Sequence, residues 1–217
     1  MLRMRNHGVD DYAALPDIGT TDVGILGEDD RACLDEIGQF LIMHDAWQRF
    51  AIWLLHKHFD PAPGEVFVER VITSRRRIDT APLARSAAAP RRLTMTAMRF
   101  DEPGRAGVNV IGMEFADAAG TGCPAPVVDN DEAALAGIAE RLRAHSKTQR
   151  FGVRLIHDPL GVSERELLLE TADTSARTVH FDIAGRDAVR PCDTVVETTW
   201  QWKPVESTRR PEGPHLI

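Results

Sequence analysis

Histidine and glutamate occur in this chain at spacings that suit metal binding or proton transfer. In residues 49–69, RFAIWLLHKHFDPAPGEVFVE, His56 and His58 stand two apart on a segment that we predict to be a strand. Alternate side chains of a strand point to one face, so both imidazoles can reach the same metal ion. Glu65 and Glu69 follow on one face of the next predicted strand. Imidazole and carboxylate are ligands of zinc and of non-haem iron, and imidazole also suits copper.

The same pattern occurs a second time. Residues 150–170, RFGVRLIHDPLGVSERELLLE, align without a gap on residues 49–69 at an offset of 101. Extended outward, the alignment has 16 identities in 49 positions. We interpret the chain as a tandem duplication that forms one pseudo-two-fold domain. The second copy repeats the first histidine and both glutamates, as His157, Glu166 and Glu170, and pseudo-symmetry would bring the two sets to one cleft.

Hydrophobic periodicity predicts the elements that position these residues. Apolar residues recur at helical spacing, behind acidic residues, in 29–47 and 131–146, and both segments are predicted helices. Residues 75–92 are rich in Arg, Ala and Pro and are predicted to be a loop. Residues 1–28 contain at most one short strand, near 23–26. Strands are predicted in the remaining apolar segments, 49–58, 65–72, 93–100, 109–116, 150–157, 166–172, 178–184 and 194–202.

These elements indicate an α+β fold. The repeating unit is a helix followed by three strands, and we expect the two helices to pack on one face of a large antiparallel sheet. Such a sheet can close towards a barrel, with a central cleft between the repeats. The chain then divides into an N-terminal segment 1–28, a first repeat half 29–101, a strand and linker 102–130, a second repeat half 131–203 and a disordered tail 204–217.

Composition and charge exclude several classes of protein. The net charge of −7 argues against a nucleic-acid-binding protein. The chain has no apolar run long enough for a membrane helix, and its N-terminus lacks the apolar core of a signal peptide. Three cysteines without close spacing, and arginine used far more than lysine, are typical of a bacterial cytoplasmic protein. We expect a small-molecule substrate as partner, no nucleic acid and no membrane; an exposed sheet edge could pair two chains into a homodimer.

The first functional hypothesis is a small-molecule enzyme, a lyase or oxidoreductase, with a His/Glu site in the cleft between the repeats. His56 and His58 would hold a divalent metal (Fe, Zn or Cu), or the cofactor would be haem. The position of His58 is occupied by Pro159 in the second copy, which favours a site on one side only. The catalytic groups would be the repeated residues, His56, His157, Glu69 and Glu170.

Two alternatives stay open at the level of sequence. One is a non-catalytic protein that binds haem or another apolar ligand in the same cleft, with a histidine as axial ligand. The other is an interaction module in which the repeated His–Glu pairs only join paired strands. Tandem modules around a shared cleft are similar in architecture to the vicinal oxygen chelate metalloenzymes and to paired-module haem-binding proteins, but no functional residue can be matched one by one.

Other residues are secondary candidates. Arg76, in the arginine-rich segment, could bind a carboxylate or phosphate group of a cofactor. Trp200 and Trp202 could line an apolar cofactor pocket or form core. His180 is an outlying candidate ligand, and Cys123, which precedes a proline, could offer a thiolate to haem or have no special role. The chain has no Walker loop and no G-x-G-x-x-G, H-E-x-x-H or G-x-S-x-G motif.

Overall fold

The computed structural model describes residues 2–19, 23–101, 107–120, 122–189, 196–204 and 215–216. Three short 3-10 helices, Thr73–Arg75, Asp129–Asp131 and Arg186–Ala188, join neighbouring elements in this part of the chain. The described α-helices and strands are, in chain order, β1 (Leu2–Asn6), α1 (Val9–Ala13), α2 (Glu28–Met43), β2 (Phe50–Leu54), β3 (Glu65–Ile72), β4 (Arg77–Ala84), α3 (Arg85–Ala88), β5 (Leu93–Phe100), β6 (Val108–Asp117), α4 (Glu132–Ala144), β7 (Phe151–Leu155), β8 (Glu166–Asp173), β9 (Thr178–Gly185), β10 (Thr199–Gln201) and β11 (His215–Leu216).

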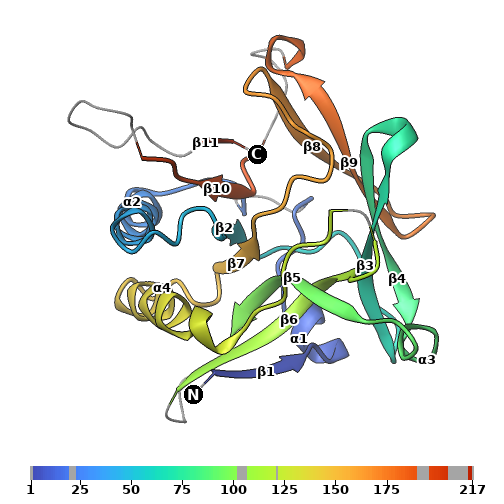
Figure 1. Cartoon of the computed structure of the whole chain (residues 1–217), viewed down its shortest axis with the longest axis horizontal. Coiled ribbons are helices and arrows are strands. Elements are labelled where there is room, and N and C mark those ends of the chain that lie inside the picture. Colours follow the sequence, from blue (N-terminus) through green and yellow to red (C-terminus); the bar gives the residue numbers. More distant parts are fainter. Residues whose placement is uncertain are drawn as a thin grey trace.

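The described strands form one mixed sheet that curls into a half-barrel (Figure 1). Their order is β11-β10-β2-β7-β5-β6-β3-β4-β9-β8, with β1 beside β6. The sheet-dominated α+β class is therefore confirmed. The expectation of a wholly antiparallel sheet is wrong, because β1 and β3 both run parallel to β6. These two strands lie end to end along one edge of the long β6, with Leu2 opposite Val108 and Phe67 opposite Glu114.

The two long helices, α2 and α4, cover one face of the sheet (Figure 1). Helix α2 begins after Gly27, whose N–H donates to the Asp30 carboxylate at 3.1 Å, and acidic side chains suit the positive end of a helix. Both predicted helices are confirmed. Their core-facing side chains are the apolar residues that recur in the sequence, Leu34, Ile37 and Leu41 of α2 and Leu135, Ile138 and Leu142 of α4.

A second apolar cluster covers the opposite face of the central strands. Trp53 of β2 and Phe67 of β3 belong to it, and α1 contributes Tyr12. The rings of Tyr12 and Phe67 are 4.5 Å apart between centroids. Ile52 and Leu54, the neighbours of Trp53, belong instead to the first cluster, as the alternation of a strand requires.

The strand expected over 49–58 is shorter, since β2 ends at Leu54. Beyond it the backbone leaves the sheet because Lys57 pairs with the N-terminal segment instead. The Lys57 N–H donates to the Pro16 oxygen at 2.8 Å, and the Ile18 N–H donates to the Lys57 oxygen at 3.1 Å. His56 and His58 therefore lie in a loop and not on a strand, which corrects the sequence-based expectation.

The prediction of a loop over 75–92 is also wrong. Residues 77–84 form β4, which pairs with β3 and β9, and α3 follows it. Ile78 and Thr80 alternate as buried residues, but the surrounding Arg and Pro residues obscured this period of two.

The chain termini differ from expectation as well. Residues 1–28 contain β1 and α1, and 23–26 is not a strand. The strand predicted over 194–202 is seen only as the three residues of β10, and 194–195 lie outside the described residues. Most of the tail predicted to be disordered, 205–214 and 217, also lies outside them, while β11 pairs with β10.

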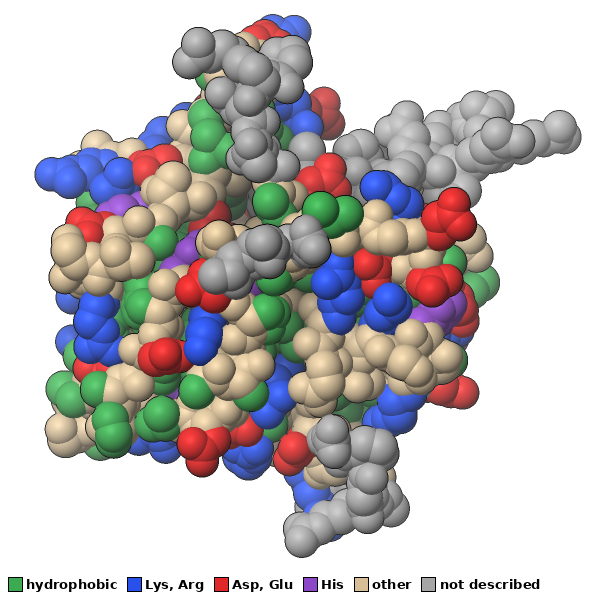
Figure 2. All heavy atoms as spheres, turned by 180° about the vertical axis from the view of Figure 1, so that it is seen from behind, with side chains coloured by type: hydrophobic (Ala, Val, Ile, Leu, Met, Phe, Trp, Pro, Cys, Tyr) green, Lys and Arg blue, Asp and Glu red, His purple; other side chains and the backbone are tan. Residues whose placement is uncertain are grey.

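Acidic and basic side chains intermingle over the face shown in Figure 2. No large area of one charge stands out there, in line with the modest net charge of −7. Within the described residues, none of the helices combines the length and the apolar character needed to cross a membrane.

Candidate functional site

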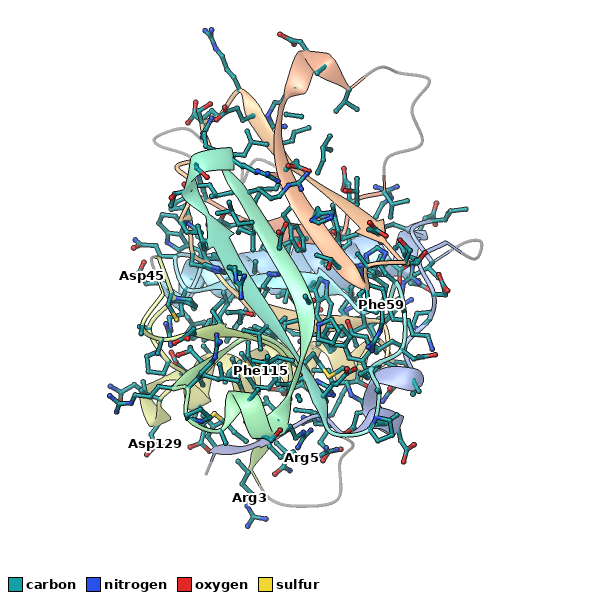
Figure 3. All side chains as sticks on the ribbon, turned by 90° about the vertical axis from the view of Figure 1, so that its right-hand side faces the viewer. Arg3, Arg5, Asp45, Phe59, Phe115 and Asp129 are labelled. Atoms are coloured by element: carbon teal, nitrogen blue, oxygen red, sulfur yellow. The ribbon has the colours of Figure 1, made fainter. Side chains whose placement is uncertain are left out.

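The histidines of interest lie just past the ends of two paired strands. His56 follows β2 and His157 follows β7, each two residues beyond the strand. The hairpins β3–β4 and β8–β9 are joined through β4 and β9 and lie side by side in Figure 3. Each hairpin supplies one glutamate to a histidine, Glu69 from β3 and Glu170 from β8.

A hydrogen bond to a backbone oxygen holds the His56 ring in one orientation. The side chain is 2% exposed, and Nδ1 lies 2.8 Å from the Leu54 oxygen. A carbonyl oxygen only accepts hydrogen bonds, so Nδ1 carries a proton and donates it there. Nε2 then faces Glu170 Oε1 at 3.2 Å. A neutral imidazole would present a lone pair to this carboxylate oxygen, so a proton or a metal ion has to lie between the two atoms.

His58 is directed at the same carboxylate oxygen. Its Nε2 is 2.8 Å from Glu170 Oε1, and its ring is perpendicular to that of His56 at a centroid distance of 5.1 Å. The Thr198 hydroxyl donates to the other oxygen, Oε2, at 3.2 Å. We call His56, His58 and Glu170 the His56 cluster; their three ligand atoms lie within 4.8 Å of one another.

Burial and charge act in opposite directions on the His56 cluster. Burial lowers the pKa of His56, but the Glu170 carboxylate outweighs burial and raises this pKa overall. Burial raises the pKa of Glu170, but His56 and His58 outweigh it and hold this pKa well below its ordinary value. Glu170 is therefore ionised at neutral pH and offers a full negative charge to a cation.

His157 and Glu69, which we call the His157 pair, repeat part of this geometry. His157 Nδ1 lies 3.2 Å from the Leu155 oxygen, and Nε2 lies 3.2 Å from Glu69 Oε2. Glu69 has two further partners, because Arg154 and the Thr96 hydroxyl each donate to its Oε1 at 2.7 Å. Glu69 thus forms a close ion pair with an arginine, whereas the close ion pairs of Glu170 are with His56 and His58.

Arg154, from β7, lies at the centre of this second group. Its Nη2 is 3.0 Å from Glu114 Oε2, and its guanidinium stacks over the Phe181 ring at 5.3 Å. Burial raises the pKa of Glu69, but Arg154 and then His157 outweigh burial and lower this pKa to about 2. Burial raises the pKa of Glu114, and here the attraction of Arg154 does not reverse it. Glu114 is therefore the carboxyl of this group that protonates most readily.

Two cavities adjoin these groups. A cleft of about 470 Å³ is lined by Glu69 and His157 together with apolar side chains of β3 and β4. A narrower cavity of about 60 Å³ is lined by His157, Arg154 and Glu170. The volume of the larger cleft is typical of a small-molecule site. His157 borders both cavities, and Glu170 of the His56 cluster lines the narrower one.

The histidines and glutamates expected at the site do come together, but with partners exchanged. We expected the histidines and glutamates of the two segments to converge on one cleft. Each histidine contacts the glutamate of the other segment, His56 with Glu170 and His157 with Glu69. The physical reason is the strand order: β7, β5 and β6 lie between β2 and β3 in the sheet, so neighbours in sequence are not neighbours in space.

The outer glutamates of both segments lie away from the site. Glu65 accepts from Arg177 at 2.6 Å, and Glu166 accepts from Arg76 at 2.9 Å. The expectation that Glu166 joins the histidines is therefore wrong. Arg76, the predicted anion-binding arginine, forms this surface ion pair apart from both cavities.

The remaining candidates also occupy other positions. Trp200 and Trp202 are 1% and 2% exposed and belong to the core beneath the helices. His180 forms a hydrogen bond with Asp79, with Nδ1 and Oδ1 at 2.6 Å. Cys123 lines the larger cleft, where its thiol contacts a backbone oxygen at 3.5 Å. The cluster of possible metal ligands found among the described residues includes none of these four candidates.

Sequence reasoning missed several polar residues of the site. Arg154 and Glu114 stand alone among apolar residues in strands that are otherwise buried. A lone charge at such a position needs a partner of opposite charge, and this signal could have joined the two. Thr96 and Thr198 carried no comparable signal, because threonine is common in strands.

Protein-family models, curated proteins and solved structures were compared with this chain, and none of them matches it. The function is therefore inferred from the two His–Glu groups and the cavities beside them.

Proposed function

We propose that this chain is a divalent-metal-dependent enzyme acting on a small molecule, with the metal held by His56, His58 and Glu170. One observation carries the proposal: two imidazole Nε2 atoms are directed at a single carboxylate oxygen, at 3.2 and 2.8 Å. Two histidines and a carboxylate are a ligand set of zinc and of non-haem iron. Bonds of about 2.0–2.1 Å would separate the ligand atoms of a tetrahedral site by about 3.3 Å, which agrees with the 3.2 Å of His56, while the 2.8 Å of His58 would have to lengthen.

A metal ion accounts for this convergence better than protons do. Protons alone would require His56 to be an imidazolium, because its Nδ1 proton already goes to the Leu54 oxygen, whereas His58 could donate from Nε2 as a neutral ring. The charged His56 ring would be buried, and burial makes its desolvation costly. A single divalent ion would accept both Nε2 lone pairs, while the Leu54 oxygen holds the His56 ring in position through Nδ1.

The surroundings of the cluster favour catalysis over a purely structural metal. Three protein ligands leave a coordination position open, as in catalytic zinc sites. The cavity of about 60 Å³ beside Glu170 has room for water or a small substrate group. A metal ion there would make bound water a nucleophile near neutral pH. We assign proton transfer to His157, oriented by Glu69, because His157 borders both this cavity and the larger cleft.

Haem receives less support than a mononuclear metal. Of the His56 cluster, Glu170 lines a cavity of about 60 Å³, whereas sites that enclose drug-sized ligands measure about 300–1,000 Å³. His56 and His58 also direct Nε2 at a carboxylate and not into an open pocket. A non-catalytic haem or apolar-ligand protein is therefore the alternative outcome of the experiment below.

We also infer that the fold is a tandem duplication with a pseudo-two-fold axis. Support comes from ion pairs that occur twice, with partners exchanged between the halves, at the sequence offset of 101. The corresponding pairs are His56–Glu170 and His157–Glu69, Arg76–Glu166 and Arg177–Glu65, and Arg49–Asp131 and Arg150–Asp30.

Backbone geometry supports the same inference. Two strand pairings place equivalent residues opposite each other, Ile52 with Val153 and Asp79 with His180. Left-handed backbone also occurs at equivalent non-glycine positions, Asp45 and Ser146 with φ of 54° and 57°, and Arg76 and Arg177 with φ of 47° and 50°. In a duplicated chain one half can change while the other keeps the original arrangement, which allows the two His–Glu groups to differ in task.

Cobalt titration of the metal-free, full-length protein tests the proposed site. Co²⁺ gives visible absorption bands that depend on its ligands, so one equivalent should saturate the bands. His58→Ala and Glu170→Gln should abolish them. His145→Ala is the matched control, because His145 Nε2 also meets a glutamate, Glu36, at 2.9 Å but lies outside the cluster.

Azide then tests whether the metal has an open position. On the enzyme proposal, azide shifts the cobalt bands by binding beside the three protein ligands. Cobalt bands that ignore azide would indicate a structural metal and contradict the catalytic part. No cobalt bands, together with a sharp Soret band on adding hemin that His56→Ala removes, would favour the haem alternative.

A further inference from the structure

The two His–Glu groups share a histidine, a glutamate and a backbone carbonyl partner, yet they differ at two positions. His58 corresponds to Pro159, so the His157 pair has no second imidazole. Trp53, whose ring lies 5.9 Å from that of His56, corresponds to Arg154. The group with the additional metal ligand has a neutral indole where the other group has a guanidinium.

In the group of His157 and Glu69, Arg154 occupies the place that a metal ion would take. Its Nη2 donates to Glu69 Oε1 at 2.7 Å and lies 3.0 Å from Glu114 Oε2. His157 Nε2 meets the other oxygen of Glu69 at 3.2 Å. In contrast, the ion pairs of Glu170 among the described residues are with the two histidines of its cluster. A guanidinium stays protonated in proteins, so the position in the second group is permanently filled by positive charge.

We propose that Arg154 is a built-in cation that excludes metal from Glu69 and His157, so that the chain binds one metal ion instead of two. This inference rests on the proposed function, because it takes the His56 cluster as the site that is filled. The consequence is a division of tasks: one His–Glu group serves the metal, and the other holds a proton between His157 Nε2 and Glu69 beside the cleft of about 470 Å³.

Removing the guanidinium would leave one imidazole and two carboxylates around the place it occupied. These are His157, Glu69 and Glu114, ligand types that suit Mn²⁺, Fe²⁺ or Zn²⁺. Their ligand atoms converge less closely than those of the His56 cluster, so a side chain has to shift for all three to bind one ion. Glu69 and Glu114 are 5% and 6% exposed, and buried carboxylates without a cation destabilise a fold. A metal ion would compensate the charge of these carboxylates, so metal binding and folding should become coupled in a variant that lacks the guanidinium.

The test compares Arg154→Ala and Arg154→His with Arg154→Lys in the full-length chain. Zn²⁺ titration calorimetry gives the number of ions bound, and thermal unfolding with and without Zn²⁺ gives the coupling to stability. R154A should bind a second equivalent, and Zn²⁺ should raise its Tm by more than it raises that of the unaltered chain. R154H adds an imidazole at the same place, so it should bind two ions even if R154A requires metal to fold. R154K retains a cation and should bind one.

Repeating the titration with Glu170→Gln present separates this inference from the proposed function. In that background the chain with Arg154 should bind no metal, and R154H should bind one ion. If R154A and R154H keep the stoichiometry of the unaltered chain, or fail to fold with Zn²⁺ present, the role assigned to Arg154 is wrong and the His56 cluster is untouched. If the unaltered chain binds none but R154H binds one, the proposed function fails and the role of Arg154 stands. Two ions bound with Arg154 in place would also contradict the inference.

Discussion

Replacing Glu170 by glutamine removes the negative charge of the His56 cluster while keeping the side chain's size. Glu170 Oε1 is 3.2 Å from His56 Nε2 and 2.8 Å from His58 Nε2. A neutral amide in this place would leave the two imidazoles without a charged third ligand. We therefore expect Glu170→Gln to lose the stabilisation that a divalent metal gives to the unaltered chain.

The size of the effect follows from mass action. A metal ion at a free concentration of 100 times its Kd stabilises the folded state by about 2.7 kcal/mol. Each kcal/mol moves the Tm of a domain of this size by roughly 2–4 °C, so the expected upward shift is about 5–11 °C. Glu170→Gln should show almost none of it.

The assay is thermal unfolding of the metal-free protein with and without Zn²⁺, read by circular dichroism. Glu69→Gln is the matched control, because it makes the same change in the His157 pair, where Arg154 already supplies a cation at 2.7 Å. This control should keep the full metal-dependent shift, even if its metal-free Tm is lower. An equal shift in Glu170→Gln and the unaltered chain, or an equal loss in both variants, would refute the reasoning.

Three further predictions concern pH and packing. In the metal-free chain the raised pKa of His56 and the lowered pKa of Glu170 make their pair most stabilising between the ordinary values, 4.5 and 6.5. As pH rises above 6.5 and through the raised pKa of His56, this stabilisation is lost and the urea midpoint should fall. As pH decreases below 4.5 towards the lowered pKa of Glu170, the midpoint should also fall. A midpoint that does not vary with pH would contradict this. Gly38→Ala should cost roughly 1–3 kcal/mol in urea unfolding, because a new Cβ would overlap the Trp202 ring, and an unchanged midpoint would count against that packing. Leu142→Ala, at a position that is 0% exposed, should cost roughly 2–5 kcal/mol in the same assay, whereas less than 1 kcal/mol would be inconsistent with its burial.

Local sequence patterns predicted most elements but not their neighbours in space. The strand expected over 65–72 coincides with β3, in which β-branched and aromatic residues dominate. The strand expected over 93–100 coincides with β5, which consists almost wholly of apolar residues and threonine. The strand β4 was missed because Arg77 and Pro82 interrupt its apolar pattern. β2 was predicted too long because the pairing of Lys57 with the N-terminal segment is a tertiary contact that no local pattern reveals.

The sequence predicted which residues form the candidate site, but not which histidine contacts which glutamate. The alignment of residues 49–69 with 150–170 singled out His56, His157, Glu69 and Glu170, all of which lie at the two groups. Which histidine meets which glutamate depends on how the sheet curls, since Glu170 is 114 residues from its partner His56. The difference between His58 and Pro159 was visible in the sequence. The role of Arg154 became visible only in the structure, because it depends on the contacts of Arg154 with Glu69 and Glu114.

Metal content per chain is the most direct test of the central claim. Protein purified without a histidine tag and without chelator would be analysed for elements, before and after incubation with Zn²⁺, Fe²⁺ or Cu²⁺ and removal of unbound ions. We expect close to one equivalent of a single divalent metal in the unaltered chain and close to none in Glu170→Gln. An unaltered chain that stays metal-free after incubation would contradict the metalloenzyme proposal and leave the converging histidines as a buried ion pair.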